Sequence, residues 1–268
     1  MNNLKAIILA AGQGERLRPL TANIPKCMVN FFGKSILKRQ IDIFQKLGID
    51  DISVVTGYCD DKINVDNIKK FKNKNFMTTN MVESLFTAEE KLTDSVIVSY
   101  GDIIFESNII QNLINSRHDI SVVVDKNWKN LWNVRFENPL DDAESLVLDK
   151  NGLILELGQK VENIDNIQGQ FIGLMKFQND GLVDIIKFYK KMKLIANSSI
   201  NPLNPNLPFE KSFMTDFLQG LIQDNQKLNA IIIKNGWLEI DSLKDYSLYQ
   251  KMYLDKSLKK LISFEEYN

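Results

Sequence analysis

Cysteine, histidine and long apolar segments are all scarce in this chain of 268 residues, and each scarcity excludes something. The two cysteines, Cys27 and Cys59, cannot form a disulfide framework, so we expect a protein of a reducing compartment, the cytoplasm. His118 is the single histidine, which argues against metal sites built from imidazole and sulfur. The apolar run at residues 6–11 is too short to cross a membrane, and charged residues follow it closely.

Net charge is also nearly absent, because 33 Lys and Arg residues are balanced by 34 Asp and Glu residues. No overall field favours nucleic acid or an anionic membrane as a partner, so any anion site must be a local cluster. The hydrophobic fraction of 44% is typical of globular proteins. Neither a linker nor a repeat divides the chain, and we expect one domain over residues 1–268. Nothing in the sequence sets the oligomeric state.

Apolar runs of strand length, rich in Ile and Val and with little alternation, recur through the first half. Such runs are typical of strands that are buried on both faces of a parallel sheet. Helical patterns lie between them, and the first of these ends at Gly48. This order predicts an α/β fold of the doubly wound type. The expected strands are residues 5–10, 52–56, 95–99 and 120–124, and the expected helices are residues 34–47, 81–92 and 108–116.

The pattern of the sequence changes after Val124. Asn151 and Gly152 predict a hairpin turn between two short strands. Three prolines among Asn and Ser predict an exposed loop at residues 197–208. The expected strands of this half are residues 133–137, 146–148, 153–157, 171–177 and 230–233, and the expected helical segments are residues 181–192, 213–223 and 242–261.

A glycine-containing stretch directly after the first strand is the most informative part of the sequence. The strand ends in small residues, and Gly12 and Gly14 allow the backbone to pass close to an anion with its amides exposed. Arg16 and Lys26 add fixed positive charge nearby. A triphosphate needs both elements, amides that cradle its oxygens and cations that take up charge as its bond breaks.

Two better-known phosphate motifs do not fit this sequence. The dinucleotide fingerprint requires a third glycine at position 17, which is Leu17. Gly33, Lys34 and Ser35 resemble the end of a Walker A loop, but the glycine required five residues earlier is Met28. An NAD-dependent enzyme and a P-loop enzyme are therefore both disfavoured.

Acidic residues follow two of the expected strands. Asp102 comes just after the strand at residues 95–99, at a carboxyl end, where open α/β sheets bind ligands. Glu239 and Asp241 precede the helical segment that begins near residue 242. Carboxylate oxygens suit Mg²⁺, which typically takes one or two carboxylates together with phosphate oxygens. Taken singly, Asp102 is equally explained as a turn cap and Asp241 as a helix N-cap.

The stretch at residues 9–21, followed by residues 25–28, closely resembles the signature of the sugar-phosphate nucleotidyltransferase superfamily. The resemblance extends through most of the chain. It implies a Rossmann-like mixed, mostly parallel sheet flanked by helices, of the nucleotide-diphospho-sugar transferase type. It also implies that Arg16 and Lys26 contact phosphates and stabilise the transition state. The loop that would wrap the nucleotide contains Leu9, Ala10, Ala11, Gly12 and Gly14.

The same resemblance implies roles in the second half of the chain. Asp102 and Asp241 match the metal-binding aspartates of the family, which implies Mg²⁺ as the cofactor. Lys160 lies where family members carry an acceptor-site lysine, although Gln159 and Val161 depart from the family's Glu and Pro. Lys160 is also explained as a solvated lysine after a strand. Trp237 and Glu239 are the other expected acceptor-site residues. Residues 1–125 would then form a nucleotide-binding half and residues 126–268 an acceptor-binding half.

Residues 80–85 resemble a segment of the branch that activates phosphocholine and aminoalkylphosphonates with CTP. This resemblance implies CTP as the donor, with Asn80, Ser84 and Gly101 in the nucleotide site. It also implies a small phosphorylated acceptor of the phosphoglutamine, phosphocholine or aminoalkylphosphonate type, for surface polysaccharide decoration. Asn80 is also explained as the cap of the helix that follows it.

Several alternatives stay open from the sequence. The chain is also compatible with a sugar-1-phosphate uridylyl- or thymidylyltransferase, or with a catalytically inactive nucleotide-binding regulatory subunit. Trp128, Trp132 and Trp237 either form an aromatic cage around a quaternary ammonium group or pack in the core. The loop at residues 197–208 either closes over the acceptor or simply connects two helices.

Overall fold

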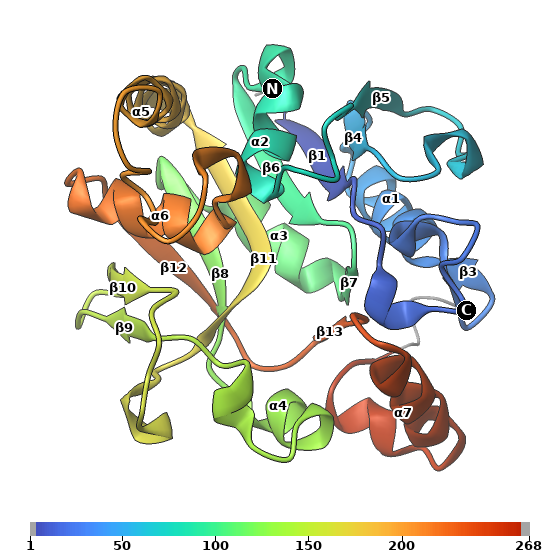
Figure 1. Cartoon of the computed structure of the whole chain (residues 1–268). Coiled ribbons are helices and arrows are strands. Elements are labelled where there is room, and N and C mark those ends of the chain that lie inside the picture. The colour runs from blue at the N-terminus through green and yellow to red at the C-terminus, as the bar shows by residue number, and fades with distance from the viewer. Residues whose placement is uncertain (1–3, 264–268) are drawn as a thin grey trace.

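The computed structural model describes residues 4–263. This part of the chain forms a central seven-stranded sheet (Figure 1). One strand, β11, runs antiparallel to both of its neighbours, and every other neighbouring pair is parallel. The mixed, mostly parallel sheet that the sequence predicts is therefore present. In order across the sheet, the strands are β12 (Leu228–Ile233), β8 (Ile120–Asp125), β11 (Gln170–Gln178), β6 (Ser95–Tyr100), β1 (Leu4–Ala10), β4 (Ile52–Thr56) and β5 (Lys69–Lys72).

Helices cover both faces of the sheet, as Figure 1 shows. On one face, α1 (Ile36–Lys46) and α3 (Ser107–Asn115) contribute apolar residues to one core cluster. On the other, α2 (Met81–Thr87), α5 (Asn179–Ala196) and α6 (Met214–Gln223) contribute to a second. Leu37, Ile41 and Phe44 of α1 are fully buried, which explains why their helical spacing is visible in the sequence.

Three short two-stranded ribbons complete the fold. The expected hairpin turn at Asn151 and Gly152 lies between β9 (Leu146–Leu148) and β10 (Ile154–Leu157). The second ribbon pairs β2 (Asn30–Phe31) with β3 (Lys34–Ser35). The third pairs β7 (Ile103–Phe105) with β13 (Trp237–Glu239), two segments far apart in the sequence. This third ribbon brings the late part of the chain beside the carboxyl end of β6.

The strand expected at residues 133–137 is wrong, because those residues lie in and after the helix α4 (Lys129–Arg135). Trp128, Leu131, Trp132 and Arg135 are its buried side and recur at helical spacing. Arg135 is charged, so the helical spacing of this buried series is not recognisable from apolar residues alone. The helix expected at residues 81–92 also ends early, at Thr87, and a separate 3₁₀ turn follows.

The C-terminal helical segment is divided into α7 (Leu243–Leu254) and a short 3₁₀ helix, Ser257–Lys260. Ser242 is the N-cap of α7, and its side chain accepts a hydrogen bond from the backbone of Asp245. The cap role considered for Asp241 thus belongs to its neighbour. Within residues 4–263, no helix combines the length and apolar character needed to span a membrane.

Candidate active site

Lys26 lies between two carboxylates that are far apart in the sequence. Its Nζ atom is 2.7 Å from Oδ2 of Asp102 and 2.6 Å from Oδ1 of Asp241. All three side chains are largely buried. The guanidinium of Arg16 approaches the other oxygen of Asp241, with Nη2 at 2.5 Å from Oδ2, and stays 70% exposed. The structure therefore brings together the two cations and the two aspartates that the sequence analysis singles out.

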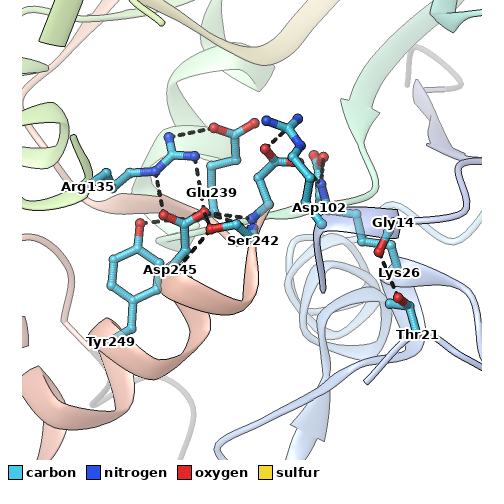
Figure 2. A network of polar contacts seen from close by, with 11 residues as sticks. Gly14, Thr21, Lys26, Asp102, Arg135, Glu239, Ser242, Asp245 and Tyr249 are labelled. Carbon is cyan, nitrogen blue, oxygen red and sulfur yellow. Dashed lines mark hydrogen bonds and ion pairs between the residues drawn. The ribbon is translucent and has the colours of Figure 1, made fainter. Parts of the chain in front are cut away.

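The backbone around Gly14 places Lys26 in this cluster (Figure 2). Gly14 has a positive φ of 65°, and a Cβ atom there would lie 2.9 Å from Cβ of Lys26. The hydroxyl of Thr21 donates a hydrogen bond of 2.7 Å to the Gly14 carbonyl. Gly14 is thus needed because the stem of Lys26 packs directly against it.

The turn that carries Asp102 is held by a buried side chain that sequence reasoning missed. The amide nitrogen of Gln40, on α1, donates to the carbonyls of Tyr100 and Ile103, at 2.8 and 2.7 Å. These two carbonyls flank Gly101 and Asp102. The Gly101 amide donates to the Leu9 carbonyl at 2.8 Å, so the turn also lies tightly against β1. No sequence signal distinguishes Gln40 from any other polar residue of a helix.

Burial and close charges set the protonation of this cluster. Burial disfavours the charged form of Lys26, but Asp102, Asp241 and Glu239 outweigh it and raise the pKa of the amine above its usual value. Burial works against the ionised form of Asp241 as well, yet Lys26 and Arg16 lower the pKa of that carboxyl. Burial raises the pKa of Glu239 to about 7. At neutral pH, Lys26 is therefore positively charged and Asp241 is negatively charged.

The carboxylates of this cluster fit a divalent cation. Asp102, Glu239 and Asp241 each offer an oxygen, and these oxygens lie within 4.8 Å of one another. Oδ1 of Asp102 is buried and has no hydrogen-bond partner within residues 4–263. A buried acceptor without a partner is costly, and a cation would satisfy it. An all-oxygen donor set also matches the preference of Mg²⁺.

A hollow of about 130 Å³ opens beside Lys26 and Asp102. Of the expected nucleotide-binding residues, all but Gly14 line it. The lining residues are Leu9, Ala10, Ala11, Gly12, Lys26, Cys27, Phe76, Thr79, Asn80, Met81, Ser84, Tyr100, Gly101 and Asp102.

Asn80 serves as a helix cap in the structure. Its side-chain oxygen accepts a hydrogen bond of 2.8 Å from the Met81 amide at the start of α2. Its backbone amide donates to the Glu210 carbonyl, also at 2.8 Å. Asn80 nevertheless lines the hollow, so the structural role and a base contact are compatible.

Lys160 lies in a different hollow, which Asp142, Glu144 and Gly158 also line. The lysine is exposed and forms no ion pair with any residue from 4 to 263. It is free to meet an acceptor, but the structure does not join it to the cluster around Lys26.

The three tryptophans pack in the core, as the simpler alternative expects. Trp128, Trp132 and Trp237 are between 1% and 4% exposed, and neighbouring ring centroids lie 5.7 and 6.1 Å apart. The indole nitrogen of Trp237 donates to Oδ2 of Asp125 at 2.9 Å. This burial contradicts an aromatic cage, and the acceptor contact expected for Trp237 stays a prediction.

Comparisons with known proteins agree with this fold. Residues 6–150 match the family described as the MobA-like NTP transferase domain. The chain is 39% identical over 255 residues to CTP:phosphoglutamine cytidylyltransferase of Campylobacter jejuni subsp. jejuni, covering 90% of this chain and 97% of the relative.

Two solved structures share the fold. The CTP:phosphocholine cytidylyltransferase from Streptococcus pneumoniae superposes with a TM-score of 0.70 at 20% identity, covering 93% of this chain and 99% of the other. The inositol-1-phosphate CTP transferase from T. maritima gives 0.67 at 21% identity, with coverage of 92% and 95%. The fold and the family match define a nucleotidyltransferase. The chain belongs to the MobA-like NTP transferase family.

Proposed function

We propose that this enzyme transfers a cytidylyl group from CTP to a small phosphorylated acceptor of the phosphoglutamine type and releases pyrophosphate. The 39% identity to the Campylobacter jejuni enzyme, over nearly the full length of both chains, supports this donor and acceptor. The observation that carries the reaction type is the convergence of Lys26, Asp102 and Asp241, the first two of which line the hollow.

The reaction is an in-line displacement at the α-phosphorus of CTP. An oxygen of the acceptor's phosphate forms the new bond to that phosphorus, and the bond to the β-phosphate oxygen breaks as pyrophosphate leaves. A phosphate monoester has a second pKa of about 6, so its attacking oxygen is largely ionised at neutral pH and needs no general base. This agrees with a site composed of cations and carboxylates, without a histidine.

Lys26 and Arg16 act by positioning and by charge. The buried amine of Lys26 keeps its charge and faces the hollow, where it would offset the negative charge that gathers on the reacting phosphate. Arg16 is exposed beside the glycine-rich loop, in a position to bind the departing pyrophosphate.

Asp102 and Asp241 would hold a Mg²⁺ ion. The ion would neutralise phosphate charge and orient the triphosphate when bound. Lys26 contacts both aspartates, so the amine and the ion would share these two carboxylates. The free Oδ1 atom of Asp102 gives the ion a first point of attachment.

The two halves of the expected single domain would divide the substrates. Residues 1–125 would bind the nucleotide, with Ser84 and Gly101 lining its hollow. Residues 126–268 would bind the acceptor, with Lys160 as the cation nearest to its phosphate or carboxylate. A cytoplasmic role in decorating a surface polysaccharide is consistent with this chemistry.

A panel of nucleoside triphosphates and acceptors, read out by pyrophosphate release, tests the proposal. CTP, UTP and dTTP are each combined with phosphoglutamine, phosphocholine, aminoethylphosphonate and glucose 1-phosphate. We expect the highest kcat/KM for CTP with phosphoglutamine. Preference for UTP or dTTP with glucose 1-phosphate would instead identify a sugar-1-phosphate enzyme. Binding of CTP with no turnover of any pair would identify a regulatory subunit.

A further inference from the structure

Asn73, the residue after β5, has a buried side chain that contacts two residues of the nucleotide hollow. Its side-chain oxygen accepts a hydrogen bond of 3.0 Å from the Asn75 amide. This contact fixes which end of the side-chain amide is the nitrogen, so the other end must donate. The nitrogen donates to Oγ1 of Thr79 at 2.8 Å and to Oγ of Ser84 at 3.1 Å.

The two hydroxyls that accept from Asn73 differ in where their own protons go. The Thr79 hydroxyl donates to the Asn75 carbonyl at 3.0 Å. For the Ser84 hydroxyl, no acceptor lies among residues 4–263. Ser84 is only 6% exposed and lines the hollow. A buried donor without an acceptor is costly, so the Ser84 proton is available to a ligand in the hollow.

Two kinds of residue line this hollow. The glycine-rich loop, Lys26 and Asp102 present amides and charges, which suit phosphates and their counter-ion. Phe76, Met81 and Ser84 present an aromatic ring, an apolar side chain and one hydroxyl. A nucleotide base prefers such surroundings, because its faces pack on aromatic and apolar groups and its edge needs hydrogen bonds. Ser84 is therefore placed to contact the base of the bound nucleotide.

We propose that Ser84, fixed as a donor by Asn73, donates its hydroxyl proton to N3 of cytosine and so selects cytosine over uracil. The inference rests on the CTP donor proposed above. N3 of cytosine carries a lone pair and accepts, whereas N3 of uracil carries a hydrogen. O2 accepts in both bases and cannot discriminate between them, and the amino group at C4 of cytosine donates. N3 is thus the position at which a fixed donor favours cytosine. Ser84 contacts the substrate, and Asn73 is a positioning residue.

CTP and 3-deaza-CTP, in which a C–H group replaces N3, test the contact of Ser84. Isothermal titration calorimetry with the full chain, without an acceptor, gives the dissociation constant of each nucleotide. Wild-type protein should bind CTP roughly tenfold more tightly than 3-deaza-CTP, the scale of one hydrogen bond. Ser84→Ala should bind the two nucleotides equally. If Ser84→Ala keeps the wild-type preference for CTP, Ser84 does not read N3 and the proposal is overturned.

Asn73→Asp tests the direction of the hydrogen bond. A carboxylate only accepts, so the Ser84 hydroxyl would donate to residue 73 and turn a lone pair to the hollow, where N3–H of uracil can donate. The preference for CTP over UTP should therefore decrease in the order wild type, Ser84→Ala, Asn73→Asp. A merely structural role of Asn73 would weaken both nucleotides alike, and an unchanged ratio in Asn73→Asp overturns the positioning role.

Asn75→Asp is the matched control for added charge. It makes the same substitution two residues further on, at an exposed side chain, and it retains the backbone amide that binds Asn73. Its ratio of CTP to UTP affinity should equal that of wild type. A fall in Asn75→Asp as large as that in Asn73→Asp would show that charge alone changes the preference, which overturns the role of Asn73.

The outcomes also separate this inference from the proposed function. Wild-type protein that binds UTP at least as tightly as CTP would remove the proposed donor, and the role of Ser84 would fall with it. A clear preference for CTP that is the same in wild type, Ser84→Ala and Asn73→Asp would leave the proposed function standing and overturn this inference alone.

Discussion

The amine of Lys26 links Asp102 to Asp241, two carboxylates far apart in the sequence, through contacts of 2.7 and 2.6 Å. The link depends on the pairing of β7 with β13, since the amide of Ile240 donates to the carbonyl of Asp102 at 2.9 Å. The fold thus uses a three-residue ribbon to assemble the site. A short, buried ribbon therefore brings the two aspartates together.

Removing the charge of Lys26 should abolish most of the activity. In Lys26→Ala, the reacting phosphate loses its buried cation, and we expect kcat/KM for pyrophosphate release to fall by roughly 10²–10³. Lys38→Ala is the matched control, because Lys38 is exposed and pairs with Asp42 on the surface of α1. Turnover of Lys26→Ala close to that of wild type would remove the lysine from the mechanism.

Gln40 should matter for both stability and metal dependence. Gln40→Leu removes the amide donor from the buried carbonyls of Ile103 and Tyr100, the second of which still accepts from the Ser99 hydroxyl at 3.1 Å. We expect the loss to cost about 1–3 kcal/mol. The turn that carries Asp102 then loosens, so the Mg²⁺ concentration for half-maximal activity should rise. Denaturant unfolding and Mg²⁺ titration measure the two effects.

Gln45→Leu is the control for this prediction, because it makes the same chemical change on the same helix at a half-exposed position. It should change neither quantity appreciably. Equal behaviour of the two variants would show that the amide of Gln40 does not fix the turn.

Substitution by alanine should lower stability at one of two glycines near the hollow and not at the other. At Gly101, a Cβ atom would lie 2.7 Å from the Leu9 carbonyl oxygen, so Gly101→Ala should lower both the free energy of unfolding and the activity. At Gly12, a Cβ atom meets nothing within 4 Å. Gly12→Ala should therefore stay within about 0.5 kcal/mol of wild-type stability and raise the KM for the triphosphate. Similar losses of stability in both variants would contradict this distinction.

The loop at residues 197–208 should behave as a fixed connection. Its Asn201 side chain is buried and donates to the Leu207 carbonyl and the Ser212 hydroxyl, at 3.1 and 3.0 Å. Asn204 donates to Asp216 at 3.1 Å. We expect hydrogen exchange in this loop to be the same with and without CTP and acceptor. Strong protection on binding both substrates would show that the loop closes.

The sequence predicts those parts of the fold that depend on local patterns. The buried strands β1, β4, β6 and β8 are continuous apolar runs, and their limits agree with the structure to within one residue. The glycine-rich loop can also be recognised from the sequence, because its signature consists of residues that are close together in the chain. By contrast, β5 consists mostly of exposed lysines, and no apolar pattern marks it.

The parts of the site that escape prediction depend on contacts between distant segments. From the sequence, Arg135 looks like a surface arginine. In the structure α4 packs beside α7, and Arg135 binds Glu239 and Asp245. The role of Gln40 depends on the packing of α1 against the turn after β6, where its amide donates to the Tyr100 carbonyl. For Trp237, the motif implies contact with the acceptor, whereas the structure buries the side chain in the core.

A crystal structure with CTP and Mn²⁺ tests the central claim most directly, because the anomalous signal locates the metal independently of any assumed chemistry. The account predicts a manganese peak bound by the carboxylates of Asp102 and Asp241, with the triphosphate along the glycine-rich loop and its α-phosphate within reach of Lys26. A manganese peak away from both aspartates, or a triphosphate outside this hollow, would contradict it.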